Sequence, residues 1–151
     1  MEHVMDAIKA YIKNHPEAFT AEATQDCPVV APREKDILLG TVDLSRYENN
    51  IIVSIMGDTD DDEPISISDV GTAHSLTVTF LCRGYQSEIL ARQICRYAEA
   101  FRKLILADST LDGEVDDSST GQRRYYPDCG TVENQMAAVE IDLSVSTILT
   151  I

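Results

Sequence analysis

The chain has 151 residues, 26 of them acidic and 12 basic, which gives a formal net charge of -14 at pH 7. This length favours a single domain, residues 1–151, with one hydrophobic core. The negative charge opposes general affinity for nucleic acids and for anionic lipids. No apolar run approaches the ~20 residues that a membrane helix needs, so we expect no membrane-spanning segment.

The first fourteen residues have the pattern of an amphipathic helix. Its apolar side chains recur at three- and four-residue spacing, at Val4, Met5, Ile8, Tyr11 and Ile12. The helix should end near Asn14, because Pro16 disfavours the helical conformation at His15. The segment also lacks the basic start and the apolar block of a signal peptide, and we therefore expect no export.

Three segments have the composition of β-strands. A short strand is expected at residues 36–42. Residues 51–56 are β-branched and apolar on both faces, which predicts a central strand covered on each side. Residues 74–82 alternate between apolar and polar side chains. We expect the acidic segment between these last two strands to be the tip of a long hairpin, with its carboxylates projecting from one end of the sheet.

The longest helical pattern runs from Ser87 to Ala107, and Ser87 is the expected N-cap. After it, Leu111, Gly113 and Val115 suggest a short edge strand, followed by a flexible polar loop. Residues 137–149 alternate strictly and predict a final strand with one solvated face. This order predicts an α+β domain, in which a mostly antiparallel β-sheet is packed by the N-terminal helix and the long helix.

Motifs of catalysis and of cofactor binding are missing from the sequence. The seven glycines are too dispersed for a P-loop or a G-x-G-x-x-G turn. The three histidines do not form H-x-x-x-H, and no G-x-S-x-G marks an activated serine. We therefore expect no enzymatic activity and no cofactor. The four cysteines form no C-x-x-C pair and should be reduced, with Cys82 and Cys95 buried on apolar faces.

The stretch GDTDDDEPISISD is the most unusual part of the chain. A calcium loop needs oxygen ligands at positions 1, 3, 5 and 12 and glycine at position 6. Asp58, Asp60, Asp62 and Asp69 match the ligand positions, but Glu63 occupies the glycine position and the flanking elements are strands. Three interpretations therefore remain: a calcium site, weak divalent binding by clustered carboxylates, and a solvated loop with an electrostatic role.

Two groups of basic residues are candidates for interfaces. Arg123 and Arg124 precede two tyrosines, and this combination fits either nucleic-acid stacking or a strand edge that contacts another subunit. The long helix carries Arg92, Arg96, Arg102 and Lys103. We interpret these first as its solvated face, although an oligomer could set them against carboxylates of a neighbour.

The chain resembles the tail terminator (tail completion) proteins of long-tailed bacteriophages. The resemblance lies in SLTVTFLCRGY, the helix SEILARQICRYAEAFRKLILAD, the segment STLDGEV, a tyrosine-containing strand and the closing AAVEIDLSVST, all preceded by a short amphipathic helix. It covers nearly the whole chain. The family shares an order of elements and has no catalytic motif, so that no catalytic residue is carried over.

The resemblance implies a minor tail or neck protein that forms a hexameric ring in the virion after synthesis in the cytoplasm of the host. The ring would cap the tail tube protein, stop tail polymerisation and present the surface for head-tail joining with a head-completion or connector protein. DNA would pass through its lumen without specific binding, since carboxylates repel the duplex. Asp58, Asp60, Asp61, Asp62 and Glu63 would then face the channel or a neighbouring component.

Two alternatives follow from the same residues. Another phage neck or tail-tube component would share the symmetry but bind elsewhere in the particle. A small α+β regulatory domain that binds a ligand or a metal would be a compact monomer or dimer.

Overall fold

A computed structural model describes residues 1–41 and 50–151, and among these residues five strands form one sheet in the order β1-β2-β3-β5-β4. β1 pairs parallel with β2, whereas all other neighbours pair antiparallel. The expected α+β class with a mostly antiparallel sheet is confirmed. The strands are β1 (Ile37–Leu39), β2 (Ile51–Pro64), β3 (Asp69–Gly84), β4 (Asp117–Tyr126) and β5 (Gln135–Thr150).

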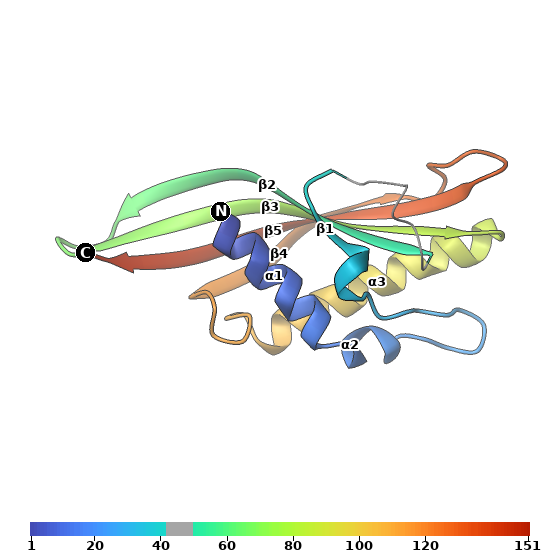
Figure 1. Ribbon diagram of the computed structural model, residues 1–151, viewed down its shortest axis with the longest axis horizontal. Helices are drawn as coiled ribbons and strands as arrows, with labels where there is room; N and C mark the ends of the chain where they lie inside the picture. The colour runs from blue at the N-terminus through green and yellow to red at the C-terminus, as the bar shows by residue number, and fades with distance from the viewer. Residues whose placement is uncertain (42–49) are drawn as a thin grey trace.

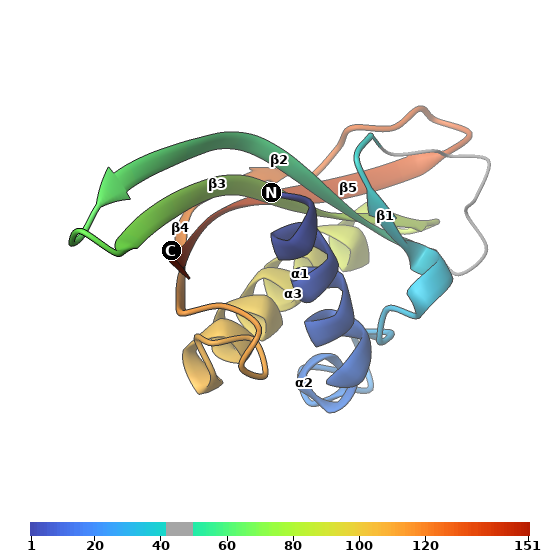
Figure 2. The ribbon, with the colours of Figure 1, turned by 60° about the vertical axis from the view of Figure 1, so that its left-hand side comes forward.

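The helices lie on one face of this sheet (Figure 1, Figure 2). They are α1 (Glu2–Asn14), the single turn α2 (Glu17–Thr20) and the long α3 (Ser87–Ala107), with a short 3-10 turn, η1 (Glu34–Asp36), before β1. The expected bounds of α1 and α3 are confirmed. The expected N-cap is wrong, because Gln86 precedes the helix and no side chain caps its first turn. None of the described helices combines the length and the apolar character that a membrane span requires.

An aromatic cluster forms the centre of the core between the sheet and the helices. The ring of Phe80, on β3, is stacked on that of Tyr97 at 5.5 Å between centroids and lies 5.8 Å from Phe19 and 5.7 Å from Phe101. Each of the three phenylalanines is fully buried. The apolar stripe of α3 and the alternation of β3 therefore meet at this point, as their two periodicities predict.

The cysteines agree only in part with expectation. All four are free thiols, and Cys82 is buried in the core as expected. Cys95 is exposed, and the expectation for it is wrong. It directly follows the buried Ile94, and one residue turns a helix by about 100°, which carries Cys95 off the apolar stripe.

Three strand predictions need correction. The first strand is confined to Ile37–Leu39, with Asp36 in η1 and Val42 outside the described residues. Leu111 and Val115 are buried in a turn instead of an edge strand, because Leu111 and the following aspartate adopt positive φ angles of 53° and 60°. The edge strand is β4, which begins in the segment expected to be a polar loop. Its second half contains Arg123 and Arg124, for which a strand edge was one of the two interpretations, and this strand is confirmed.

His15 joins the end of α1 to this turn. Its Nε2 lies 2.9 Å from Asp112 Oδ2 and its Nδ1 lies 3.2 Å from Glu17 Oε1. The hydrogen bond with Asp112, supported by that with Glu17, raises the pKa of His15 above its usual 6.5. The protonated ring therefore contributes stability that is fully present below pH 6.5 and is lost as the pH rises through the raised pKa.

We expect the substitution His15→Gln to reveal this pH dependence. Because both carboxylates are largely exposed, the loss should be less than about 1 kcal/mol. Chemical denaturation should show the largest difference between wild type and variant below pH 6.5 and a smaller one at alkaline pH. Asp112→Asn should reproduce most of the effect. A difference that grows with rising pH would contradict the assignment.

Candidate functional site: the acidic strand and the projecting sheet

The acidic run is part of a strand and does not form a loop. Residues 58–63 lie within β2, and the turn of the hairpin is made by residues 65–68. The pairing with β3 continues to Pro64 opposite Val70. The expectation of an acidic hairpin tip is therefore wrong. Charged residues are tolerated in this strand because none of the described strands pairs with its other edge beyond Ile55.

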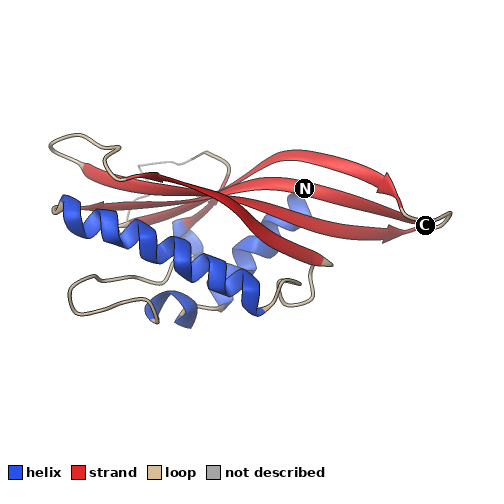
Figure 3. Cartoon of the chain, turned by 180° about the vertical axis from the view of Figure 1, so that it is seen from behind, coloured by secondary structure: helices blue, strands red, loops and turns tan. Residues whose placement is uncertain are grey.

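Three strands extend together beyond the helices as an arm (Figure 1, Figure 3). We define the arm as residues 59–64 of β2, 69–74 of β3 and 145–150 of β5, which are paired with one another. Five exposed apolar side chains lie near its end, at Ile65, Ile67, Ile148, Leu149 and Ile151. The apolar alternation of β5 continues to Leu149 as expected, but Leu149 is exposed since the helices no longer cover the sheet there.

A β-bulge divides the acidic run between the two faces of the sheet. Gly57 stands opposite Leu76 and Thr59 opposite Ser75, which leaves Asp58 as the extra residue. After the bulge, Asp60 and Asp62 face the helix side of the sheet, which we call the inner face. Asp61 and Glu63 face the opposite, outer face. The charges therefore do not act as a single cluster.

On the inner face, Asp60 belongs to a chain of hydrogen bonds across three strands. His74 Nδ1 lies 2.6 Å from Asp60 Oδ1, and His74 Nε2 lies 2.8 Å from Thr147 Oγ1. His74 is buried at the point where the core ends and the arm begins. One residue pair further out, Thr72 Oγ1 donates to Asp62 Oδ1 at 2.6 Å. These bonds satisfy polar groups and fasten β2 and β5 to β3.

The Asp-His-Thr order has the connectivity of a hydrolytic triad, but its surroundings differ from those of an active site. A nucleophile needs an accessible position for the reacting atom beside it. The groove that includes Thr147 is lined mainly by residues of the outer face, such as Asp61, Ala73 and Ser146, on the side away from His74. We therefore interpret the chain of bonds as structural.

The four candidate metal ligands do not converge. Asp58 is the bulge residue, and Asp60 and Asp62 bond to His74 and Thr72. Asp69 accepts hydrogen bonds from Ser66 and Thr150 at the turn. Within the described ranges, no group of three or more His, Cys, Asp or Glu side chains is placed to hold a metal ion. An extended strand also spreads its ligands along its length, whereas a calcium loop wraps them around one point.

The outer face of the sheet is rich in hydroxyl and carboxylate groups. Two shallow grooves follow it, one of about 400 Å³ near the middle of the sheet and one of about 460 Å³ on the arm. Their polar side chains come from β2, β3 and β5. They include Ser54, Asp58, Asp61, Glu63, Thr77, Thr79, Glu140 and Ser146. Apolar burial on this face, at Ile52, Leu81 and Ala138, is confined to the end away from the arm.

Arg124 does not give the outer face a free cation. Its guanidinium donates to both oxygens of Asp142, at 2.9 and 3.1 Å, and reaches Glu140 at 3.4 Å. The hydrogen bond with Asp142 raises the pKa of Arg124, and the same bond lowers the pKa of Asp142. Arg123 is exposed, and no ion pair joins it to another part of the chain that the structure describes.

The basic residues of α3 are engaged within the chain. Arg92 pairs with Glu88 and Arg102 with Glu99 along the helix. Arg96 donates to the carbonyl of Glu22 and to Thr24 Oγ1, and Lys103 pairs with Glu22. Arg96 and Lys103 thus hold the segment after α2 against the long helix. Their interpretation as a face for a neighbour stays a prediction.

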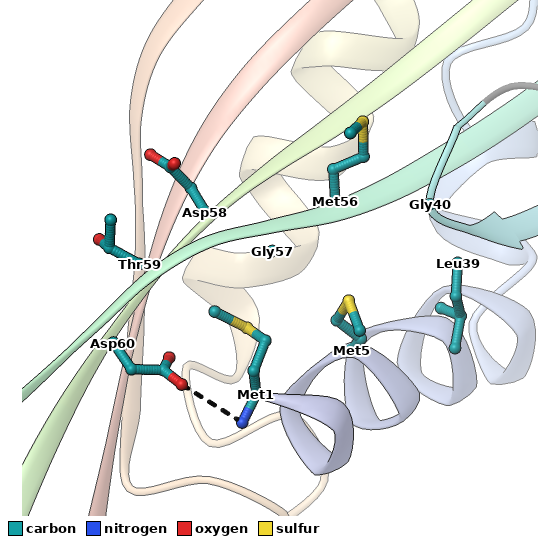
Figure 4. Close-up of a pocket in the computed structure, with 9 residues that line it drawn as sticks. All are labelled: Met1, Met5, Leu39, Gly40, Met56, Gly57, Asp58, Thr59 and Asp60. Atoms are coloured by element: carbon teal, nitrogen blue, oxygen red, sulfur yellow. Dashed lines mark ion pairs between the residues drawn. The ribbon is translucent and has the colours of Figure 1, made fainter.

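A methionine-lined groove adjoins the open edge of β2 (Figure 4). It encloses about 350 Å³ between the start of α1, the end of β1 and the bulge. Asp60 points toward the Met1 nitrogen, 3.7 Å away, whereas Met56 and Asp58 point to the other side of the strand. Its lining residues are Met1, Met5, Leu39, Gly40, Met56, Gly57, Asp58, Thr59 and Asp60.

Sequence reasoning missed His74 and Thr147 as the partners of the acidic run. Both occupy inward positions of otherwise apolar alternations, and this signal was available. The sequence did not reveal the register of β2 against β3. The bulge at Asp58 sets this register and so determines which carboxylates face His74. No protein-family model matches the sequence, and no curated protein sequence matches it either.

Proposed function

We propose that the chain is a non-enzymatic structural subunit of a bacteriophage virion. In this proposal six copies form a ring in the neck, which ends the tail tube and provides the surface that joins the head. The observation that carries the proposal is the outer face of the sheet. Hydroxyl and carboxylate groups line it along β2, β3 and β5, and none of the described helices covers it.

An uncovered acidic sheet suits the wall of a DNA channel. Carboxylates repel the phosphates of the duplex, and hydroxyl groups offer no cation that would hold them. The one described arginine near the middle of this face, Arg124, is neutralised by two carboxylates. The helices would then lie on the outside of the ring, since they occupy the other face of the sheet (Figure 2).

The arm offers a separate surface to a protein above or below the ring. Its exposed isoleucine and leucine side chains gather at one end of the molecule, and exposed apolar groups of this kind are typical of protein interfaces. The tail tube protein and the head-completion protein are the two partners that the proposal requires.

Neutralising the outer carboxylates tests the channel role. We expect Asp61→Asn with Glu63→Gln to slow DNA ejection from mutant virions, because the wall loses repulsive charge. These exposed residues should alter the free energy of unfolding by less than about 0.5 kcal/mol. The matched control is Asp60→Asn with Asp62→Asn, which removes the same charge from the inner face and should destabilise the arm instead.

Two outcomes would contradict this proposal. If both pairs of substitutions changed the ejection kinetics equally, the effect would not depend on the outer face. If labelling showed that the neck of the particle lacks the subunit, the proposed structural role would be wrong.

A further inference from the structure

Among the described residues, the sheet has two edges at which backbone groups are left unpaired. β1 pairs with β2 only from Val53 to Ile55, so that β2 is unpaired on that side from Met56 to Pro64 among the described residues. At the other side of the sheet, β4 is the last described strand along its whole length. Each edge presents backbone N–H and C=O groups that can accept another strand.

The two edges carry opposite charges. β2 bears five carboxylates between Asp58 and Glu63. On β4 the charges are Asp117 at its start, Arg124, which is already paired with Asp142 and Glu140, and the exposed Arg123. Like charges facing each other oppose pairing, so that two β2 edges repel. A β2 edge and a β4 edge attract. The charges therefore select head-to-tail pairing between copies over two-fold symmetric pairing.

The strand directions permit this contact. β2 is antiparallel to β3, β3 to β5, and β5 to β4. If the sheet continues in the same orientation into the next copy, β4 therefore meets β2 in the antiparallel sense. The register across the sheet places Arg123 level with Ile55 and Tyr126 level with Ile52, where β1 already occupies the edge. A stagger along the strands is needed.

A closed ring supplies a stagger of the required size. Strands in closed sheets tilt by roughly 35–45° from the barrel axis and lie ~4.8 Å apart. Over four strands this tilt shifts the next copy along the strand direction by about 13–19 Å, or ~4–6 residues. A shift of about five residues moves Arg123 from the level of Ile55 to that of Asp60. Because the bulge places Gly57 and Asp58 at one pair position, the same shift moves Tyr125 to the level of Gly57 and Tyr126 to that of Met56, both beside the methionine-lined groove (Figure 4).

The side chains match at this register. Tyr125 and Tyr126 are the exposed aromatic residues of β4, and the groove beside Gly57 is apolar with an acidic rim. Arg123, which is exposed, would face the carboxylates of the neighbour. The end of the pairing with β1 at Ile55 and the missing N–H of Pro64 bound the accepting stretch, and the bulge at Asp58 within it restricts the register.

We propose that β4 of one copy adds antiparallel to the free edge of β2 in the next copy, with Arg123 beside Asp60 and the two tyrosines at the methionine-lined groove. The inference rests on the proposed ring for closure, and it specifies how the copies join. The sheets then form one continuous wall with the outer faces toward the lumen.

Paired charge reversals test this junction. One variant carries Asp61→Lys and Glu63→Lys, which makes the β2 edge basic, and the other carries Gln122→Glu and Arg123→Glu, which makes the β4 edge acidic. All four side chains are exposed. At low salt we expect each variant alone to need at least about tenfold more protein to assemble than wild type, since charges at exposed pairs contribute up to ~1 kcal/mol each. An equimolar mixture should restore rings in which the variants alternate, as measured by light-scattering mass and negative-stain images.

A proline variant tests the backbone pairing itself. The carbonyl of Ser146 accepts from the amide of Asp116, so that even-numbered residues of β5 turn toward β4. The register then turns the amide of Tyr125 outward. Tyr125→Pro should leave the monomer folded, as judged by circular dichroism, and abolish assembly, whereas Tyr125→Ala should only weaken it.

The outcomes separate this inference from the proposed function. Rings formed by Tyr125→Pro, or charge variants that fail to complement each other, would overturn the strand junction while leaving a ring built through other surfaces. A wild-type chain that stays monomeric at high concentration would overturn both. Complementing variants whose virions lack the subunit in the neck would retain the junction and reject the phage role.

Discussion

Replacing Phe80 by alanine is expected to lower the free energy of unfolding by about 3 to 5 kcal/mol. Phe80 is fully buried, and its ring contacts those of Phe19, Tyr97 and Phe101. These rings come from α2, α3 and β3, so that the cavity would lie where the helices meet the sheet. A loss of this size is a large part of the stability of an ordinary domain.

Urea denaturation of the isolated protein at low concentration measures this effect without the contribution of assembly. Phe80→Leu keeps much of the volume and should cost clearly less than the alanine variant. Tyr125→Ala removes an exposed aromatic ring and should change the free energy by less than about 0.5 kcal/mol. Equal losses at Phe80 and Tyr125 would contradict the position of the core.

The second large effect is expected at His74, where substitution by leucine should cost about 1 to 3 kcal/mol. The variant removes the hydrogen bonds to Asp60 and Thr147 and leaves both groups beside an apolar side chain. Because these bonds join three strands at the base of the arm, the arm should open locally before the whole domain unfolds.

Amide hydrogen exchange can locate this opening. Protection should fall in residues 59–64 and 145–150 more than in α3. The control is Thr72→Val, which removes the more exposed bond to Asp62 and should cost less than about 1 kcal/mol. Unchanged protection of the arm in His74→Leu would show that the chain of bonds does not hold it.

The elements with a strong period could be predicted from the sequence. One face is buried along α1, along α3 and along the buried half of β5. The residues on that face are the apolar residues that recur with the helical or strand period, so the sequence pattern identifies them. β4 could not be predicted in this way. It is an edge strand with little apolar content, and its place depends on β5, to which it pairs from Asp117 to Tyr126.

The acidic run shows why a charge pattern alone is ambiguous. Five carboxylates in six positions indicate that the segment is exposed to solvent. Exposure is typical of a loop, but a strand that is unpaired on one side is also exposed. Strand propensity depends on the neighbours across the sheet, and these include Thr72 and His74 opposite the carboxylates. The acidic run could therefore be identified from the sequence as a candidate site. The division of its carboxylates between the inner and the outer face of the sheet could not be predicted.

The strand order also determines when the sheet can be completed during synthesis. β4 reaches the rest of the sheet through β5, and β5 is translated after β4 although it lies between β4 and β3. On the ribosome the helices and the β2-β3 hairpin can fold while β4 still has no strand to pair with. A chain that stops early therefore cannot present β4 in its final place. Translation of β5 is thus the event that completes the β4 edge of the sheet.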